Sequence, residues 1–139
     1  SLMTTLLLKE MGVKKIVVKA LGEVHGKMLQ KIGADKIIYS EKEMGIRVAH
    51  NLISPGIVDY IEMENNITIV SIHVPADWVG KNLIQIDVRR KYNINVAAIK
   101  RAGEMMVNPR PDMKLEAKDM VVILGDNESV KKVAETLTE

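Results

Sequence analysis

The tripeptide Ser54-Pro55-Gly56 divides the chain into two stretches with different patterns. Before it, apolar runs at 14–20 and 35–39 alternate with helical patterns, which predicts the order α-β-α-β-α. Helical crossovers leave the two strands parallel. After a connector, residues 67–139 follow the order β-α-β-β-β-α, which is typical of a small α+β domain. We therefore predict an α/β domain at 1–53, a linker at 54–66 and an α+β domain at 67–139.

The first stretch has too few strands to form a sheet of its own. Its runs of Ile and Val are typical of parallel strands that are buried on both faces. Two strands cannot bury those faces, because a stable sheet needs more of them. We expect residues 1–53 to be the second half of a doubly wound, Rossmann-like sheet. Its missing half would lie beyond this sequence or in a separate chain, and its last helix would pack against a neighbouring subunit.

One stretch of the second domain, residues 81–111, is the best candidate for a binding region. It begins with an amphipathic helix predicted over Asn82–Tyr92, which Asn93 can end because asparagine tolerates a positive φ. A strand over 94–99 follows, and Ala102-Gly103 makes a tight turn into a second strand. The stretch concentrates charges of both signs, so we expect a ligand or a partner to bind here.

Composition excludes several classes of function. The 20 basic and 18 acidic residues leave a net charge of +2, and aromatic residues make up 3%, so we expect no nucleic-acid partner. The chain has no cysteine, and His25, His50 and His73 stand in no metal-ligand spacing. No nucleophile has a base pattern beside it, so we predict a protein that is not an enzyme. No apolar run reaches the ~18 residues of a membrane span, which favours a cytoplasmic location. We expect the nine methionines to fill the core.

Several runs of the sequence resemble one family. TTLLLKEMGVKKIVVKA and HGKMLQKIGADKIIYSEKEMG resemble the second half of the nucleotide-binding domain in Trk/Ktr-type potassium-uptake regulatory subunits (RCK domains). GKNLIQIDVRRKYNINVAAIKRAGEMMVNPRPD and LEAKDMVVILG resemble their C-terminal TrkA-C domain. The resemblance implies a non-enzymatic regulatory subunit that assembles as a homodimer or higher oligomer. Such subunits lie at the inner face of the membrane on a potassium-translocating partner.

The resemblance also implies ligands. In the Ktr branch the TrkA-C domain binds cyclic di-AMP across a dimer, and the positions that match the lining of that cleft are Leu83, Ile84, Asp87, Arg89, Asn95, Val96 and Pro111. The Rossmann part of the family binds adenine nucleotides, but none of the nine glycines here forms the G-x-G-x-x-G phosphate loop. We therefore expect no required cofactor, and ATP, ADP or NAD binding only if the missing half is supplied.

Two residues of the first stretch are weaker candidates. Glu41, in YSEKEMG, resembles an acidic position that holds a cation in some Ktr relatives. A carboxylate at a helix N-terminus is also favoured simply by the helix dipole. Lys19, at the end of a strand, could be a remnant of the nucleotide pocket, or it could be only a solvated side chain.

Alternatives of other classes stay open at this point. The chain could be a fragment of a dinucleotide-dependent oxidoreductase, or a purely structural dimerisation module. For the candidate cleft, the alternative is that Leu83, Ile84 and Val96 are core residues and that Asp87 and Arg89 form a surface ion pair. In the regulatory interpretation, a bound ligand would shift the geometry of a dimer, and the linker would transmit the change.

Overall fold

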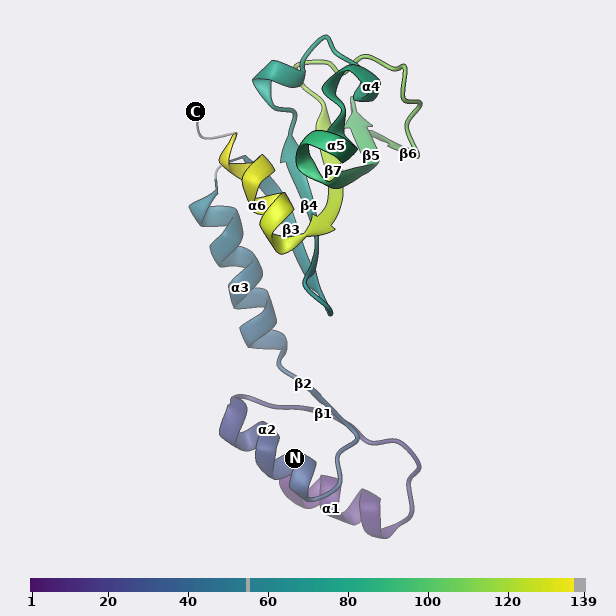
Figure 1. The fold of residues 1–139 in the computed structure, drawn as a ribbon. Coiled ribbons are helices and arrows are strands. Elements are labelled where there is room, and N and C mark those ends of the chain that lie inside the picture. Colours follow the sequence, from purple (N-terminus) through teal and green to yellow (C-terminus); the bar gives the residue numbers. More distant parts are fainter. Residues whose placement is uncertain (55, 137–139) are drawn as a thin grey trace. The chain divides into compact units, whose positions relative to one another are not determined.

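The computed structural model describes residues 1–54 and 56–136, which form two compact units divided between Val48 and Ala49. The division falls within one helix, α3 (Ser40–Ile53), rather than at the tripeptide that the sequence singled out (Figure 1). Each unit has its own cluster of buried apolar side chains.

The first unit has the predicted alternation of helices and strands. Its elements before α3 are α1 (Leu2–Glu10), β1 (Val17–Lys19), α2 (Glu23–Lys31) and β2 (Lys36–Ile38). The two strands are parallel, with Val18 opposite Ile37, as predicted. The core is small, because only Ala20, Leu29 and Ala34 form its buried cluster.

The expectation that these strands are buried on both faces is wrong for the unit as described. Val17 is 47% exposed, and Leu21 just after β1 is 76% exposed. The reason is that only one strand pairs with each of them within the described residues, and each sheet face needs a covering layer. The first unit, as described, therefore leaves part of the apolar surface of these strands exposed.

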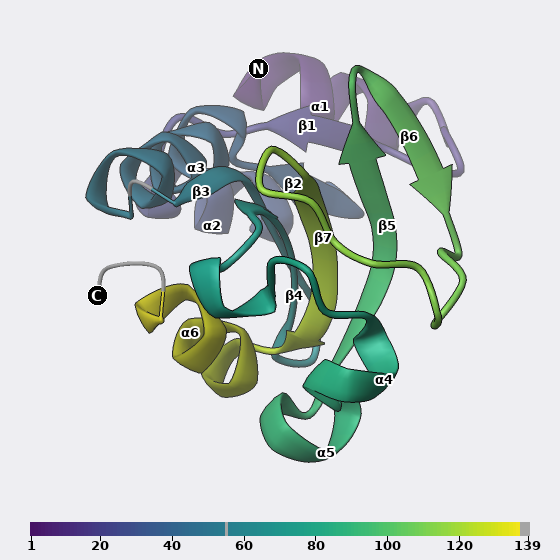
Figure 2. The same ribbon diagram turned by 90° about the horizontal axis from the view of Figure 1, so that it is seen from above.

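The second unit is built on a five-stranded antiparallel sheet. The strands are β3 (Ile57–Met63), β4 (Ile67–His73), β5 (Ile94–Arg101), β6 (Glu104–Val107) and β7 (Met120–Asp126). Their order in the sheet is β3-β4-β7-β5-β6 (Figure 2). The predicted linker at 54–66 is therefore wrong over 57–63, since this segment is an edge strand paired along its length with β4.

Short helices lie on one face of this sheet, as Figures 1 and 2 show. They are the 3₁₀ turn η1 (Ala76–Trp78), α4 (Leu83–Ile86), α5 (Val88–Tyr92) and α6 (Asn127–Glu135). The continuous helix predicted over 82–92 is wrong, because Asp87 has φ 57° and separates α4 from α5. Asn93 ends α5 with φ 54°, as predicted. The Ala102-Gly103 turn is also confirmed, with φ of 50° and 82°.

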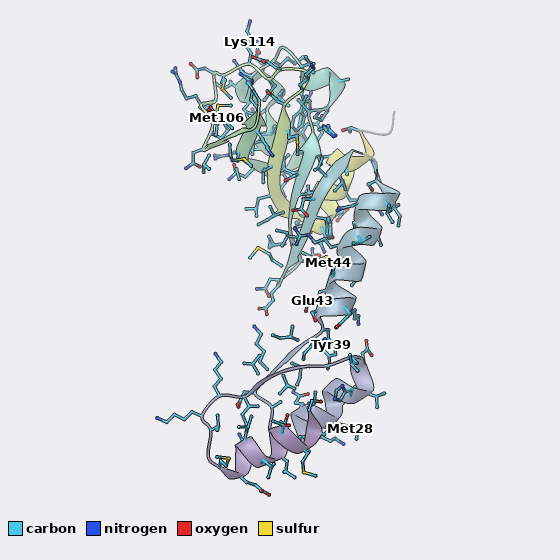
Figure 3. The ribbon with its side chains drawn as sticks, turned by 180° about the vertical axis from the view of Figure 1, so that it is seen from behind. Met28, Tyr39, Glu43, Met44, Met106 and Lys114 are labelled. Carbon is cyan, nitrogen blue, oxygen red and sulfur yellow. The ribbon has the colours of Figure 1, made fainter. Side chains whose placement is uncertain are left out.

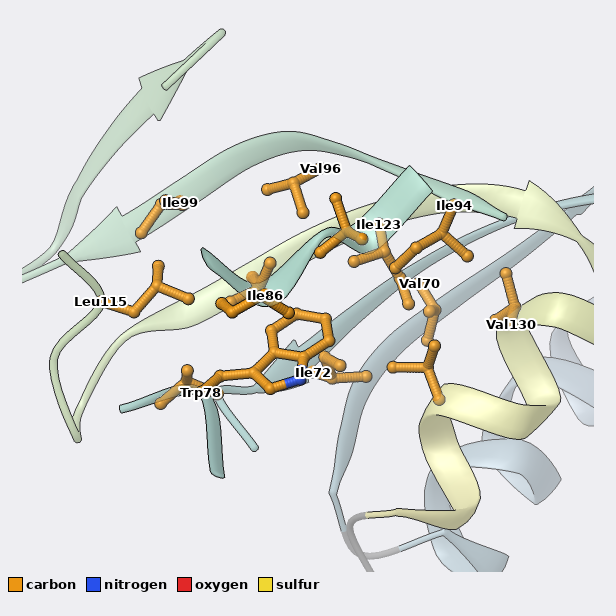
Figure 4. Close-up of a cluster of buried hydrophobic side chains, with 14 of the residues drawn as sticks. Val70, Ile72, Trp78, Ile86, Ile94, Val96, Ile99, Leu115, Ile123 and Val130 are labelled. Atoms are coloured by element: carbon orange, nitrogen blue, oxygen red, sulfur yellow. The ribbon is translucent and has the colours of Figure 1, made fainter. Parts of the chain in front are cut away.

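Trp78 lies at the centre of the core between the helices and the sheet. Its side chain is 1% exposed and lies among Ile72, Ile86 and Leu115 (Figure 4). Its ring centroid is 5.6 Å from that of Tyr92 on α5. One large side chain of η1 thus packs between the sheet, the loop after β6 and the α4–α5 pair, and this packing helps to fix the position of α4 and α5 above the sheet.

The methionines depart from the prediction that they fill the core. Met28 and Met44, labelled in Figure 3, are 49% and 54% exposed, and Met11 is 77% exposed. Among the methionines of the described residues, Met106 and Met113 pack against the large core as partly buried residues. Among the described residues, no helix combines the length and apolar character that a membrane crossing requires.

Candidate functional site

A hollow of about 440 Å³ opens in the second unit between the α4–α5 pair, β5 and the loop after β6. Its lining residues are Leu83, Ile84, Asp87, Val88, Arg89, Asn95, Val96, Asn108, Pro109 and Pro111. All seven residues predicted for the ligand cleft are among them. The structure therefore brings together side chains that are up to 28 positions apart in the sequence (111 minus 83).

The first wall is the α4–α5 pair. Asn82 begins α4 through a capping box, in which its side chain accepts from the Gln85 N–H while the Gln85 side chain accepts from the Asn82 N–H. Leu83 packs partly against the core, whereas Ile84 is 65% exposed. The interpretation of Ile84 as a core residue is therefore wrong, and its side chain is available at the hollow.

The break at Asp87 explains how this wall differs from an ordinary helix. Ile86 and Val88, two positions apart, are both buried, and residues two apart in one helix point to nearly opposite sides. A left-handed residue between them turns the chain so that both can reach the core. Aspartate tolerates that conformation better than most residues. As a result, Asp87 and Arg89 lie at the hollow together.

The second wall is β5, which alternates between core and hollow. Ile94 and Val96 are buried at 3% and 6%, and Asn95 between them is exposed. Val96 thus belongs to the core, as the alternative interpretation held, and also lines the hollow. Asn95 presents an amide, with a donor and an acceptor, from the part of β5 that pairs with β7.

The third wall is the loop after β6. Asn108 adopts φ 51°, and its N–H donates to the Ala97 carbonyl at 3.0 Å. This bond ends the β5–β6 ladder and directs Pro109 and Pro111 to the rim of the hollow. Met106 and Lys114, labelled in Figure 3, precede and follow this segment in the sequence.

The lining of the hollow carries one charge of each sign, Asp87 and Arg89. Arg89 is exposed and makes no ion pair with any residue in the described parts of the chain. Asp87 instead lies 4.0 Å from the guanidinium of Arg90, so the predicted Asp87–Arg89 pair is wrong. A free guanidinium can bind a phosphate through two parallel hydrogen bonds. Asp87 adds a hydrogen-bond acceptor to the same wall.

A second, shallower hollow of about 370 Å³ lies beside the first. Arg89 and Asn95 border both, and Asn93, Ile94 and Leu124 complete the second. The Asn93 amide donates to Asp126 at 3.1 Å, and Asp126 caps α6 by accepting from the Ser129 N–H at 2.8 Å. The hydrogen bond from Ser129 holds the pKa of Asp126 below its usual value. These bonds connect the end of α5 to the start of α6.

Lys19 and Glu41 meet in the first unit, which the sequence did not predict. The Lys19 Nζ lies 2.5 Å from the Glu41 Oε1, and both side chains are more than half exposed. The hydrogen bond from Lys19 holds the pKa of Glu41 below its usual value, with smaller help from the Ser40 hydroxyl. Among the described residues, no group of three His, Cys, Asp or Glu could hold a metal ion. A cation at Glu41 and a nucleotide contact at Lys19 both stay predictions.

Sequence reasoning missed three lining residues: Val88, Asn108 and Pro109. Val88 was hidden by the assumption of a continuous helix. Asn108 and Pro109 had a visible signal, because an Asn-Pro step directly after a strand favours a turn.

Comparisons with known proteins agree with the fold of the second unit. The family model of the TrkA-C domain matches residues 67–138. The Ktr system potassium uptake protein C of Bacillus subtilis is 41% identical over 125 residues, which cover 90% of this chain and 57% of that protein. The Ktr system potassium uptake protein A of the same organism is 37% identical over 95% of this chain and 60% of its own length. This chain thus spans about three fifths of these relatives.

One solved structure is the KtrA regulator of conductance of K⁺ (RCK) C domain in complex with cyclic diadenosine monophosphate. It is 23% identical, has a TM-score of 0.47, and covers 63% of this chain and 92% of its own. The family model matches more than half of the residues here. The chain therefore belongs to the TrkA-C domain family of Ktr and Trk potassium-uptake proteins, a regulatory family and not an enzymatic one.

Proposed function

We propose that this chain is part of a regulatory subunit of a potassium-uptake system, and that its second unit senses cyclic di-AMP. The observation that carries the proposal is the hollow itself. Its walls contain every position that matches the cyclic di-AMP cleft of the Ktr branch. Those positions come from a helix pair, a strand and a loop, so sequence proximity alone does not explain why they meet.

The chemistry of the walls suits a purine nucleotide. Ile84 and Pro111 offer exposed apolar surface that can flank an adenine face. Arg89 offers a guanidinium without an ion-pair partner among the described residues, suited to a phosphate. Asn95 and Asp87 can bond the polar edge of a base, where adenine has both a donor and an acceptor.

A symmetric dinucleotide also fits a two-fold dimer. Cyclic di-AMP presents the same base and phosphate twice, so two copies of the chain can each supply the same residues once. The hollow is open on the surface of the single chain, which leaves room for a second copy to close it. Binding would then favour one dimer geometry over others, as a population shift.

The path of that shift differs from the one expected at first. β3 belonged to the predicted linker but is itself a strand of the sheet, so that residues 54–56 alone separate it from α3 in the sequence. A change in dimer geometry would therefore reach α3 through β3. From there it would reach the first unit, which we propose to be the second half of a Rossmann-like domain. A first half supplied beyond this sequence or by another chain would add the missing strands and the site for ATP, ADP or NAD.

The whole subunit would act on a potassium-translocating membrane protein from the inner, cytoplasmic face of the membrane. The support for this part is the similarity to the Ktr proteins, which reaches 41% identity over most of this chain.

Calorimetric titration with cyclic di-AMP tests the proposal, with ATP as the control nucleotide. We expect one cyclic di-AMP per two chains and no ATP binding. Arg89→Ala should weaken binding, because a hydrogen bond to a charged group contributes about 1.5–3 kcal/mol, and a bridged dimer loses two such contacts. That amounts to a loss of roughly a hundredfold or more in affinity.

Arg90→Ala is the matched control. Arg90 is the next residue in the same helix, its side chain is 87% exposed, and it does not line the hollow. We expect its affinity to stay close to that of the unmodified chain. Equal losses in both variants would show that general positive charge, rather than the hollow, attracts the ligand. No binding of either nucleotide would leave a structural dimerisation module.

A further inference from the structure

A partly buried ion pair, Arg101 with Asp119, lies outside the lining of the hollow. Asp119, directly before β7, is 1% exposed, and Arg101 is the last residue of β5. The guanidinium donates to both carboxylate oxygens, from Nε to Oδ1 at 2.8 Å and from Nη2 to Oδ2 at 2.6 Å. The bidentate bond holds the pKa of Asp119 below its usual value. This geometry is the strongest form of a side-chain ion pair.

The same guanidinium also contacts the loop that precedes β7 in the sequence. Its Nη2 also donates to the Lys114 carbonyl at 3.0 Å, and its Nη1 lies 3.1 Å from Glu116. Asp119 in turn accepts from the Glu116 N–H at 2.8 Å. Residues 114–119 are thus folded around one side chain rather than held by regular secondary structure.

This loop is connected to two walls of the hollow, the α4–α5 pair and the loop after β6. Leu115, which is 1% exposed, donates from its N–H to the Lys81 carbonyl at 2.9 Å and accepts from the Gly80 N–H at 2.8 Å. Lys81 directly precedes the Asn82 cap of α4. In the other direction, the loop continues back to Pro111 and the rim.

We propose that Arg101 and Asp119 are positioning residues that set the spacing between the α4 wall and the proline rim of the hollow. The inference rests on the proposed ligand site, but neither residue touches the ligand. The fork of Arg101 contacts three residues of the loop, which an ammonium or an apolar side chain cannot do in the same plane. Without it, the loop would keep Leu115 in the core but lose its fixed path between the walls.

The decisive variant replaces the pair with apolar residues, Arg101→Leu with Asp119→Leu. Such a replacement of a buried ion pair is often neutral or stabilising, so the variant is expected to fold. Arg101→Lys is the second variant, since it retains the charge and loses the fork. The control is Glu128→Ala with Lys132→Ala, which removes an exposed ion pair within α6.

The first readout needs no ligand. The chain has no cysteine, so Lys81→Cys and Arg110→Cys provide unique sites for two spin labels, one beside each wall. Labelled chain diluted with unlabelled chain should give a narrow distance distribution. We expect a clearly broader one in the double-leucine variant and an unchanged one in the control. An unchanged width in the double-leucine variant overturns the proposal, whether or not the chain binds cyclic di-AMP.

The second readout is affinity for cyclic di-AMP by calorimetry. We expect a loss of about tenfold or more in both Arg101 variants, with cooperative unfolding retained, because misplaced walls lose contacts on both sides of the ligand. If the unmodified chain binds and the double-leucine variant binds equally well, the positioning role is refuted. If the unmodified chain does not bind, the proposed function fails instead, and the distance measurement alone decides the role of the pair.

Discussion

Two glycine-to-alanine substitutions in the first unit should have opposite effects on stability. Gly26 lies in α2 and Gly45 in α3, both inside helices, where alanine is favoured over glycine by about 1 kcal/mol. A Cβ at Gly45 would meet nothing within 4 Å. We therefore expect Gly45→Ala to raise the free energy of unfolding by nearly this whole amount.

At Gly26 the same methyl group meets Tyr39. The Cβ would lie 1.9 Å from the phenol oxygen and 2.7 Å from the ring carbon that bears it. Ordinary carbon contacts need about 3.5 Å, so the ring must move by roughly 1.5 Å. Tyr39 packs against the small core of this unit, and overpacking of this kind costs about 1–3 kcal/mol. We therefore expect Gly26→Ala to lower the free energy of unfolding by about 0–2 kcal/mol. The free energies of unfolding of the two variants should then differ by about 1–3 kcal/mol.

Urea unfolding followed by far-ultraviolet circular dichroism measures both variants against the unmodified chain. Tyr39→Ser provides the cross-check, since Gly26→Ala should become stabilising once the ring is gone. If Gly26→Ala stabilises as much as Gly45→Ala with Tyr39 intact, the packing of Tyr39 onto α2 described above is incorrect.

Three further predictions concern the second unit. Trp78→Ala should lower the free energy of unfolding by about 3–5 kcal/mol in urea titrations, because the indole is 1% exposed, and a loss below 1 kcal/mol would contradict its central place. Ala102→Asn should raise the melting temperature through a gain of about 1 kcal/mol, since Ala102 has φ 50° and asparagine tolerates that region; a lower melting temperature would count against the turn. The pKa of Asp119 is lower in the folded state than in the unfolded state, so the unfolded state takes up the proton first as the pH falls. The ion pair therefore contributes its full stability above a pH of about 3.8, and this contribution is lost as the pH falls through the lower pKa of the folded state. Asp119→Asn should therefore lose less stability than the unmodified chain between pH ~6 and ~3, and equal losses would remove Asp119 from the acid response.

The sequence indicated residues that line the hollow, but it did not indicate how the backbone brings them together. The resemblance supplied seven positions, and the structure gathers all of them around one hollow. The helix break at Asp87 was not foreseen, although Ile86 and Val88 gave a signal. Two apolar residues that flank an aspartate cannot both face the core from one helix. A turn residue between them resolves the conflict.

Other features depended on tertiary contacts that local patterns do not contain. β3 was taken for a linker, because only its pairing with β4 makes a strand of a sequence with Asp59 and Glu62 in it. The bidentate pair of Arg101 and Asp119 joins residues 18 positions apart, and no spacing rule predicts it. The apolar side chains of β1 and several methionines were assigned to a core, but Val17 and several methionines are largely exposed in the described residues.

Native mass spectrometry of the chain with cyclic di-AMP tests the central claim most directly, because it counts chains and ligands in one complex. The account predicts a species with two chains and one cyclic di-AMP, which Arg89→Ala reduces and Arg90→Ala preserves. One ligand on each single chain would contradict the shared two-fold site. A dimer that takes up no cyclic di-AMP would contradict the sensing role altogether.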